Sequence, residues 1–581
     1  MRGAAAIGSI ASMTMDAEPR ELAPPNAALQ AVVVVPARDE AQRIGACLLA
    51  LAHQRGVAPD SYEVIAVLDG CRDATADVVR EVEDSEPYLH VHVIALADSQ
   101  GVGRARRAGM EEACARLLSL GRDQGLIAST DADSIVADDW LACQLTLAEH
   151  GARAIGGHIE LHPHELSGLA VEALQEREHR VAARMRAVLE QAQPAVSTEH
   201  HQFSGASLAL TAETYRRCGG LPVRAALEDE ALEQALRERD VPIHRSRSVR
   251  VSTSARTDGR APRGLARDLA RSDWRARRSY AAEELTLEHL LERKSESVAL
   301  VLPAREVAAT IGAIARSVAE LLDAGLIDEA LVVDAGSRDD TVAIARAAGL
   351  TVVQEDELAG ELGPARGKGD AMWRALGELD SEIVAFVDTD TEDFPRHFIT
   401  GLVGPLICDP AVHLVKGFFR RPFRTSEGAI APEGGGRVTE LMARPLLNLH
   451  APELAVFHQP LAGETAARRD LLEQLPFSAG YGVEIAMLID AWRIVGLDGL
   501  AQVDLGVRQN RHQTLRELSA MAYAVLVAAQ SRFLGADFAD AHASGSISLP
   551  ALEASGAMEL RRVTVEERPP LVEFRAASAA S

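Results

Sequence analysis

The chain carries one ordered set of motifs twice, and this internal repeat constrains its fold more than any other feature. The first copy contains AVVVVPARDEAQRIGACLLAL, then YEVIAVLDGCRDATADVVREV, then GLIASTDADSIVADDW. The second copy contains VALVLPAREVAATIGAIARSV, then EALVVDAGSRDDTVAIARAAG, then EIVAFVDTDTEDFPRHF. Self-similarity of this kind marks a repeated structural unit, so we expect two related domains.

Each copy alternates short β-branched runs with stretches of helical period, which is the pattern of βαβ units. We therefore predict an α/β fold with two domains in tandem, each a mainly parallel sheet flanked by helices. The length of 581 residues agrees, because a single core rarely grows beyond about 250–300 residues.

Composition places the domain boundaries. An Arg-, Glu- and Leu-rich stretch of helical spacing separates the two copies, and Ala, Ser, Glu and Pro dominate the end of the chain. We expect a flexible tail at 1–30, a first domain at 31–257, a helical connector at 258–295, a second domain at 296–547 and a flexible tail at 548–581.

The overall charge and the cysteines exclude several classes of protein. A formal charge of -25 repels phosphate backbones and anionic membranes, so we expect no nucleic-acid partner. Six scattered cysteines without a C-x-x-C pair argue against zinc and disulfide scaffolds. No window approaches the roughly 20 apolar residues of a membrane span, and the first residues do not resemble a secretory signal. We expect a cytoplasmic protein. The sequence does not give the oligomeric state, and a homodimer is one possibility.

Two carboxylates follow a buried run in each copy. Asp388 and Asp390 come after IVAFV, and Asp131 and Asp133 come after IAST. At a strand end, residues i and i+2 share a face, so both carboxylates of a pair can converge on one ligand such as Mg²⁺ or Mn²⁺. An Asx-rich turn is the alternative, and the repetition at matching places argues against it.

Loops beside these carboxylates offer donors for a nucleotide. Pro303 and Ala304 lie in the turn after VALVL, and Ser337 follows the next strand, so backbone and hydroxyl groups can meet a base and ribose. Lys368, in the Gly-flexed RGKG loop, suits a diphosphate. A solvent-exposed lysine is the alternative for Lys368.

The run GGGRVT offers a second anion site. Gly436, Arg437, Val438 and Thr439 stand at the start of a helical pattern, where N–H groups, a guanidinium and a hydroxyl can converge on a phosphate or carboxylate. A bare helix start is the alternative. The basic run at 416–424 adds local positive charge or forms a salt-bridged surface strand.

Longer motifs make the second copy similar to the retaining glucosyl-3-phosphoglycerate synthase family, which transfers glucose from UDP-glucose to 3-phosphoglycerate. The resemblance rests on VVDAGSRDDT, RGKGDAMWRAL, FVDTDTEDF, GGGRVTELMARPLL, QPLAGE and GYGVEI. It implies a nucleotide-sugar transferase fold of the GT-A type. It also implies a donor site at Pro303, Ala304, Ser337, Lys368, Asp388 and Thr389, a metal on Asp390, an acceptor site at Gly436, Arg437, Val438 and Thr439, and Glu464 near the transferred sugar.

The second copy departs from that family at three places. Val307 stands where the family has an acidic residue, and Thr465 follows Gly-Glu in place of Tyr. Asn510 stands where the family has a metal-binding histidine, and His512 stands two places on, where an acceptor-side Asn belongs. We assign His512 to the acceptor; the alternative is that it replaces the missing metal ligand.

The first copy resembles the broad family-2-like inverting glycosyltransferases. The resemblance rests on PARDE, on DGCRDAT, on the D-x-D motif, on FSGASL and on the acidic triplet at 228–230. It implies Asp229 as the general base and Asp133 on the metal. It also implies a donor site formed by Pro36, Glu40, Asp69 and Asp131. An acid pair at a helix start is the alternative for Asp229.

Together these patterns predict a tandem glycosyltransferase that needs Mg²⁺ or Mn²⁺. The second domain would glucosylate 3-phosphoglycerate with retention, and the first would be an inverting transferase whose acceptor the sequence does not give. One alternative is that one domain only binds a sugar nucleotide or regulates the other. Another is that GDP-mannose is the donor.

Overall fold

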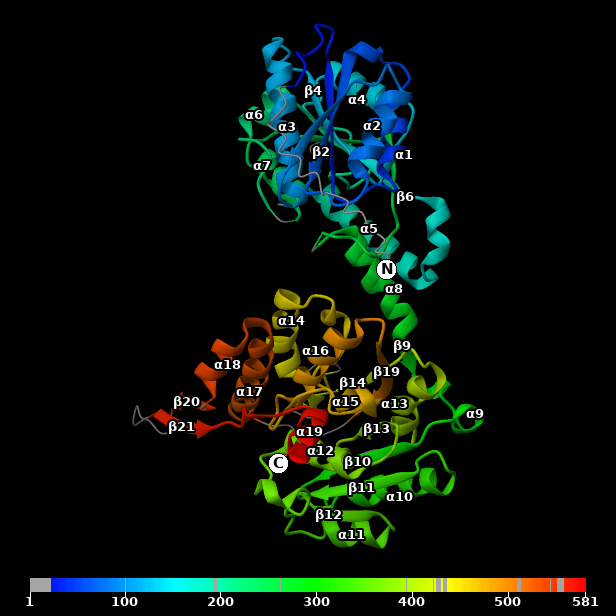
Figure 1. The fold of residues 1–581 in the computed structure, drawn as a ribbon, viewed down its shortest axis with the longest axis vertical. Helices are drawn as coiled ribbons and strands as arrows, with labels where there is room; N and C mark the ends of the chain where they lie inside the picture. Colours follow the sequence, from blue (N-terminus) through cyan, green and yellow to red (C-terminus); the bar gives the residue numbers. More distant parts are fainter. Residues whose placement is uncertain are drawn as a thin grey trace, which may run out of the picture. The chain divides into compact units, whose positions relative to one another are not determined.

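The chain, seen in a computed structural model, divides into two compact units, Met1–Asp273 and Trp274–Ser581. The structure describes residues 22–99, 101–191, 196–224, 226–261, 263–392, 394–421, 423–424, 430–431, 436–508, 514–543, 545–550 and 558–580. Each unit has its own sheet covered by helices (Figure 1). The predicted α/β architecture of two tandem domains is confirmed. No helix within the described ranges is long and apolar enough to cross a membrane.

The first sheet has the strand order β3-β2-β1-β4-β7-β6-β8-β5. Strand β1 pairs in parallel with β2 and β4, β7 runs antiparallel between β4 and β6, and β6 pairs in parallel with β8. The strands are β1 (Ala31–Ala37), β2 (Tyr62–Asp69), β3 (Val91–Leu96), β4 (Leu126–Ser129), β5 (Ser134–Val136), β6 (Ala154–Leu161), β7 (Leu208–Thr211) and β8 (Ile243–Thr253).

Helices cover both faces of this sheet, which explains why β1 is apolar and buried along its whole length. Val33 and Val35 pack toward α1, α2 and α4, whereas Val32 and Val34 pack toward α3, α6 and α7 (Figure 1). The helices are α1 (Ile44–Ala52), α2 (Thr75–Ser85), α3 (Val102–Ser119), α4 (Trp140–Glu149), α5 (Val171–Glu190), α6 (Ala212–Arg217) and α7 (Glu228–Arg237), with short turns η1 (Pro59–Ser61) and η2 (Pro163–Gly168).

The second sheet has the order β12-β11-β10-β13-β17-β14-β19-β9, which matches the first sheet position by position over seven strands. This match is the structural form of the sequence repeat. The strands are β10 (Val298–Ala304), β11 (Glu329–Asp334), β12 (Thr351–Gln354), β13 (Ile383–Phe386), β14 (Leu414–Arg420), β17 (Thr465–Arg468), β19 (Leu500–Val507) and β9 (Ser279–Ala281).

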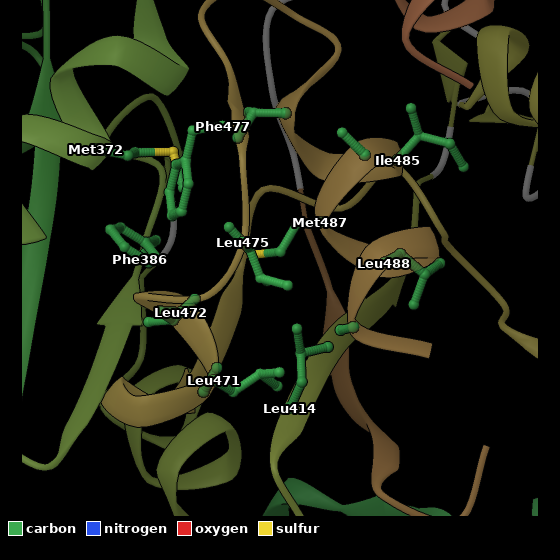
Figure 2. Packing of buried hydrophobic residues seen from close by; sticks show 14 of the residues in the cluster. Met372, Phe386, Leu414, Leu471, Leu472, Leu475, Phe477, Ile485, Met487 and Leu488 are labelled. Carbon is green, nitrogen blue, oxygen red and sulfur yellow. The ribbon is translucent and has the colours of Figure 1, made fainter. Parts of the chain in front are cut away.

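Two apolar cores lie on the two faces of the second sheet. Figure 2 shows part of one of them, in which Met372 of α12, Phe386 of β13 and Leu488 of α16 are among the packed side chains. The helices are α9 (Leu287–Arg293), α10 (Ile311–Asp323), α11 (Thr341–Ala347), α12 (Lys368–Glu378), α13 (His397–Cys408), α14 (Arg444–His450), α15 (Arg469–Leu472), α16 (Val483–Val495), α17 (Leu515–Leu534), α18 (Ala536–His542) and α19 (Leu571–Ala580), with short turns η3 (Ala282–Glu284), η4 (Gly360–Leu362) and η6 (Leu454–Val456) and the π-helix η5 (Thr439–Ala443).

The stretch 258–295, expected as a helical connector, is in part built into the second unit. Helix α8 (Leu265–Arg278) contains the division between the units, and β9 after it pairs in parallel with β19. Trp274 is buried, and its indole Nε1 donates to the Leu497 carbonyl at 2.8 Å. The charge-rich composition of this stretch did not predict its packing into the second unit, because only one tryptophan and a three-residue strand make these contacts.

The last residues of the N-terminal stretch, which was expected to be a flexible tail, are packed against the first unit. Residues 1–21 lie outside the described residues. Leu29 is fully buried, and the Arg116 guanidinium donates to the Ala23 carbonyl at 2.8 Å. The packed first unit therefore includes residues before 31.

The C-terminal stretch 548–581, also expected as a tail, is structured where it is described. Strands β20 (Ser546–Pro550) and β21 (Met558–Arg562) form a hairpin, and β22 (Glu567–Arg568) pairs with β18 (Phe477–Ser478). Arg568 donates to both carboxylate oxygens of Asp370 at 2.7 and 2.9 Å, and Trp373 Nε1 donates to the Pro569 carbonyl at 2.8 Å. Pairing with partners some 200 positions earlier in the chain is invisible to local composition.

Two further short strands, β15 (Phe423–Arg424) and β16 (Ile430–Ala431), pair with each other in the second unit.

Candidate functional site

In the second unit, the two carboxylates predicted to bind a metal lie just after β13. Asp388 accepts from Lys368 Nζ at 2.6 Å and from Arg508 Nη2 at 3.4 Å, and Asp390 accepts from Arg508 Nη2 at 2.7 Å. Burial alone would raise the pKa of Asp388, but the charges of Lys368 and Arg508 hold it well below its usual range. Lys368 and Arg508 therefore keep the Asp388 carboxylate ionised.

The donor set at this place fits a divalent cation. The Asp390 side chain is 58% exposed, so a metal and a substrate phosphate have access to it. Within the described ranges, no group of three or more His, Cys, Asp or Glu side chains is placed to hold a metal by itself. Mg²⁺ and Mn²⁺ bind through one or two carboxylates and complete their shell with water and substrate phosphates.

Glu464, the predicted catalytic carboxylate, is fully buried just before β17. Its Oε1 accepts from Arg508 Nη1, and its Oε2 has no hydrogen-bond partner within the described structure. Burial raises the pKa of Glu464, Arg508 opposes this, and the nearby Asp388 adds to it. One carboxylate oxygen at the site is thus held by the chain, and the other is left for a ligand.

Close packing around Glu464 requires a glycine at 463. A Cβ added at Gly463 would lie 2.4 Å from an oxygen of Asp388. Gly463 thereby lets the segment that carries Glu464 approach the metal-binding carboxylates. This close approach explains the glycine in the motif QPLAGE.

Lys368 begins α12 and lies between two acids. Its Nζ donates to Asp388 at 2.6 Å and to Glu484 of α16 at 2.8 Å. Burial would lower the pKa of Lys368, but Asp388 and Glu484 raise it above its usual value. The sequence placed Lys368 at the donor diphosphate, and it missed Glu484, whose only signal was its place in GYGVEI.

The turns predicted to hold the nucleotide are tied together at the carboxyl ends of β10, β11 and β13. The Glu306 amide donates to Ser337 Oγ at 2.9 Å, and the Ser337 amide donates to Asp334 Oδ2 at 3.0 Å. Thr389 Oγ1 donates to the carbonyl of Pro303, the residue before Ala304, at 2.6 Å. The structure thus brings together Pro303, Ala304, Ser337 and Thr389.

The predicted acceptor segment leads into a π-helix. Gly436 has φ +71°, a left-handed conformation that favours glycine, and its carbonyl accepts from the Glu440 amide at 3.0 Å. Arg437 and Val438 are helical and continue directly into η5, and Thr439 is buried. The predicted helix start is present. His512 and Asn510 lie outside the described residues, so their assignments stay predictions.

In the first unit, the carboxylates of the predicted donor and metal site are bound by arginines. Arg256 donates to both carboxylate oxygens of Glu40 at 3.0 and 2.7 Å, and it lies 2.9 Å from Asp133. Arg260 donates to the same Glu40 at 2.7 Å. Burial and the neighbouring Asp131 raise the pKa of Asp133 to about 6, and Arg256 opposes this.

The remaining predicted residues of the first unit lie around a buried arginine, Arg106. Arg106 donates to Asp131 at 2.7 Å and to Glu228 at 3.1 Å. The predicted base Asp229 accepts from the Gly205 amide at 3.1 Å. The structure therefore connects the D-x-D motif, FSGASL and the acidic triplet.

Two further predicted donor residues end their strands at the same edge of the first sheet. Asp69, at the end of β2, accepts from Ser99 Oγ at 3.0 Å and from the Gly101 amide at 3.1 Å. Pro36 of β1 lies opposite Val67 of β2. Only the strand pattern of the sequence pointed to these positions, and the hydrogen bonds of Asp69 could not be predicted from it.

Each unit has an arginine at an equivalent position after its last long strand, and neither arginine was predicted as a site residue from the sequence. Arg256 follows the last long strand β8 and binds Asp133, just as Arg508 follows β19 and binds Asp390. Each arginine meets the second acid of a D-x-D motif. The repeat thus extends to the counter-charge of the predicted metal site.

The chain is similar to several known proteins. The family model described as "Glycosyl transferase family 2" matches residues 32–184 and 300–437. Glucosyl-3-phosphoglycerate synthase of Mycolicibacterium paratuberculosis is 45% identical over 262 residues, 45% of this chain and 79% of the relative. The Mycolicibacterium smegmatis enzyme of the same name is 41% identical over 307 residues, 52% of this chain and 98% of the relative.

Solved structures give similar identities. The crystal structure of glucosyl-3-phosphoglycerate synthase from Mycobacterium tuberculosis with Mn²⁺, UDP-glucose and phosphoglyceric acid is 40% identical, with a TM-score of 0.44. It covers 50% of this chain and 95% of its own. Mannosyl-3-phosphoglycerate synthase from Rubrobacter xylanophilus is 41% identical, with a TM-score of 0.47, and covers 52% of this chain and 99% of its own.

Proposed function

Because the chain belongs to glycosyl transferase family 2 and, through its second unit, to the glucosyl-3-phosphoglycerate synthases, we propose that this unit transfers glucose from UDP-glucose to 3-phosphoglycerate with retention. The chain is a glycosyltransferase. The observation that carries the proposal is Glu464, a buried carboxylate with one oxygen on Arg508 and the other without a partner in the described structure, beside Asp388 and Asp390.

Glu464 is suited to stabilise positive charge. As the bond between the sugar and the diphosphate breaks, the sugar carbon gains oxocarbenium character, and a fixed carboxylate in a buried site stabilises that charge strongly. Arg508 fixes Glu464 through a hydrogen bond. The free oxygen of Glu464 is then the one that faces the transferred sugar.

Cations and donors of the chain hold the two substrates. Lys368 and Arg508, now on Asp388 and Asp390, lie where a diphosphate would enter and can transfer their hydrogen bonds to it. Asp390 would hold Mg²⁺ or Mn²⁺, which supplies charge neutralisation for the leaving diphosphate when it is bound. Arg437 and Thr439 would hold the phosphate of the acceptor.

For the first unit we propose an inverting sugar transfer with Asp229 as the base. Asp229 accepts a hydrogen bond from the amide of Gly205 in FSGASL. Arg106, which donates to Asp131 of the D-x-D motif, also donates to the Gly205 carbonyl. A second candidate is a non-catalytic binding module, favoured by Arg256 and Arg260 on Glu40 and Asp133. Homodimer formation and a cytoplasmic location stay predictions.

A donor screen on the full chain tests the function of the second unit. Released nucleotide would be measured with 3-phosphoglycerate and either UDP-glucose or GDP-mannose, and the anomeric configuration of the product would be read by NMR. We expect an α-linked glucoside from UDP-glucose and loss of turnover in Glu464→Gln. The exposed Glu320→Gln of α10 is the matched control. Preference for GDP-mannose, or full activity of Glu464→Gln, would overturn the proposal.

The first unit is tested in the same chain with the second unit disabled by Glu464→Gln. Turnover of a nucleotide sugar that disappears in Asp229→Asn supports the transferase. Binding of the nucleotide sugar without any turnover over a panel of acceptors supports the binding module.

A further inference from the structure

The first unit contains a cleft that neither the donor site nor the D-x-D motif uses. Its volume is about 420 Å³. It lies between the end of β6, the helix α5 and the segment 199–202 that follows this helix. Its polar lining includes His158, Arg177, His200, His201 and Gln202.

The repeat gives this cleft a counterpart in the second unit. Strand β6 corresponds to β14 in sheet order, since each pairs in parallel with the last long strand and antiparallel with β7 or β17. The segment after β14 carries Arg437 and Thr439, the predicted anion site. The segment after β6 carries α5 and Arg177, so both units place an arginine in the connection that follows the same strand.

The base of the cleft is rigid. The Gln202 side chain clamps the backbone of Ile159, donating to its carbonyl and accepting from its amide, both at 2.8 Å. His200 is held through both nitrogens, with Nε2 at 3.2 Å from the Ser246 carbonyl and Nδ1 accepting from the Gln202 amide at 3.1 Å. His200 is thus a neutral structural residue, and it leaves its neighbours to meet a ligand.

Three side chains above this base have unused hydrogen-bonding capacity. Arg177 is half-buried, and neither it nor His201 makes a hydrogen bond or ion pair within the described part of the chain. His158 packs its ring against that of His200 at 5.5 Å and lies 3.6 Å from the exposed Glu160. A guanidinium and two imidazoles therefore converge on one cleft.

Two arginines, Arg177 and Arg247, and three acids line the cleft. Burial, together with the positive charges of Arg184 and Arg177, lowers the pKa of His201 to about 4. Of these acids, Glu199 is bound by β8, accepting from the Arg247 amide at 2.6 Å. Glu160 is exposed, and Glu178 is exposed on α5 beside Arg177.

We propose that this cleft binds an anionic group, a carboxylate or a phosphate, through Arg177, His158 and His201. Under the function proposed for the first unit, this group belongs to the sugar acceptor. That assignment rests on the proposed function, whereas anion binding itself does not.

Carbethoxylation of histidines with diethyl pyrocarbonate, mapped by mass spectrometry on the full chain, tests the site without any donor. The ligands would be inorganic phosphate, glycerate and neutral glycerol. We expect phosphate or glycerate to slow modification of His158 and His201 about fourfold or more, because a bound anion covers the ring nitrogens and favours their protonation. Glycerol should have no effect. The relative effects of phosphate and glycerate identify which anion is preferred.

Arg177→Gln should abolish the protection. Arg180→Gln, three positions along α5 and bonded to Glu176 and Ser272 instead, is the matched control and should keep it. Protection by glycerol equal to that by the anions, absence of protection by either anion, or protection that survives Arg177→Gln would overturn the proposal. An inactive first unit that still shows the protection would refute only the acceptor assignment.

Discussion

The guanidinium of Arg508 lies against the carboxylate of Glu464, and both side chains are buried, with 1% and 0% of their area exposed. Removing one partner of a buried ion pair leaves the other charge uncompensated, which typically costs about 3–5 kcal/mol. The same ion pair therefore stabilises the second unit and positions Glu464 for its proposed role.

We expect Arg508→Met to lower the free energy of unfolding of the second unit by about 3–5 kcal/mol, because Glu464 is left buried without its cation. Adding Glu464→Gln to this variant should restore part of the loss. Urea unfolding of the wild type, both single variants and the double variant measures the coupling. A loss below about 1 kcal/mol for Arg508→Met would show that the pair is not a buried unit.

Asp390→Ala should abolish turnover by the second unit, since the leaving diphosphate then lacks several kcal/mol of charge stabilisation, about what a bound metal supplies. EDTA should have the same effect on the wild type. Nucleotide release measures both, and the exposed Asp380→Ala is the control. Turnover that persists in EDTA would contradict a metal on Asp390.

Arg437→Lys should raise the KM for 3-phosphoglycerate by about tenfold or more, because lysine cannot reproduce a bidentate guanidinium. The KM for the nucleotide sugar should not change. Arg346→Lys on the exposed surface of α11 is the control. A change in donor affinity with unaltered acceptor affinity would show that the anion site is misassigned.

Lys416 predicts a measurable dependence of stability on pH. Burial lowers the pKa of Lys416 to about 8, whereas an unfolded lysine releases its proton near about 10.4. Between these values the unfolded state binds more protons, so the stability that Lys416 contributes rises with pH by about 1.4 kcal/mol per unit. Below about pH 8 both states are protonated, and this contribution stays constant.

Relative to Lys416→Met, the wild type should therefore gain stability between about pH 8 and about pH 10. Urea midpoints of both proteins at the two pH values measure the difference, in which other titrating groups cancel. A difference that stays constant or shrinks with rising pH would show that Lys416 keeps its proton in the folded protein.

Arg568→Met should destabilise the second unit by about 1.5–3 kcal/mol, because two hydrogen bonds to the buried Asp370 are lost. Arg575→Met is the matched control, since Arg575 pairs with Glu473 on the surface and should cost less than about 1 kcal/mol. Thermal unfolding measures both. Equal effects of the two variants would remove the special role of Arg568.

Local pattern was sufficient for the parts of the fold that depend on neighbours in the chain. The buried run of β1 and its counterpart β10 were visible as apolar stretches, and the acids after β4 and β13 followed from strand ends. Lys368 was predicted from its Gly-flexed loop, and Glu464 from the family resemblance. Lys368 donates to Asp388, and Glu464 accepts from Arg508, which also donates to Asp388.

Long-range partners could not be predicted in this way. Arg508 meets Glu464 across 44 residues, and Lys368 meets Glu484 across 116. A single arginine after a strand or a glutamate within a helix carries no periodic signal. The sequence suggests either local positive charge or a salt-bridged surface strand for the run that contains Lys416. Lys416 is buried and donates to Thr465 Oγ1 at 2.9 Å, because its strand lies inside the sheet.

Strand β9 has a practical consequence for separating the two units. A fragment that begins at residue 296 lacks β9 and Trp274, so the backbone N–H and C=O groups of β19 that pair with β9 would face solvent. An unpaired sheet edge of this kind recruits strands from other molecules and promotes aggregation. A soluble second half therefore has to begin upstream of Trp274, and precipitation of a shorter one would report a damaged edge, not an inactive enzyme.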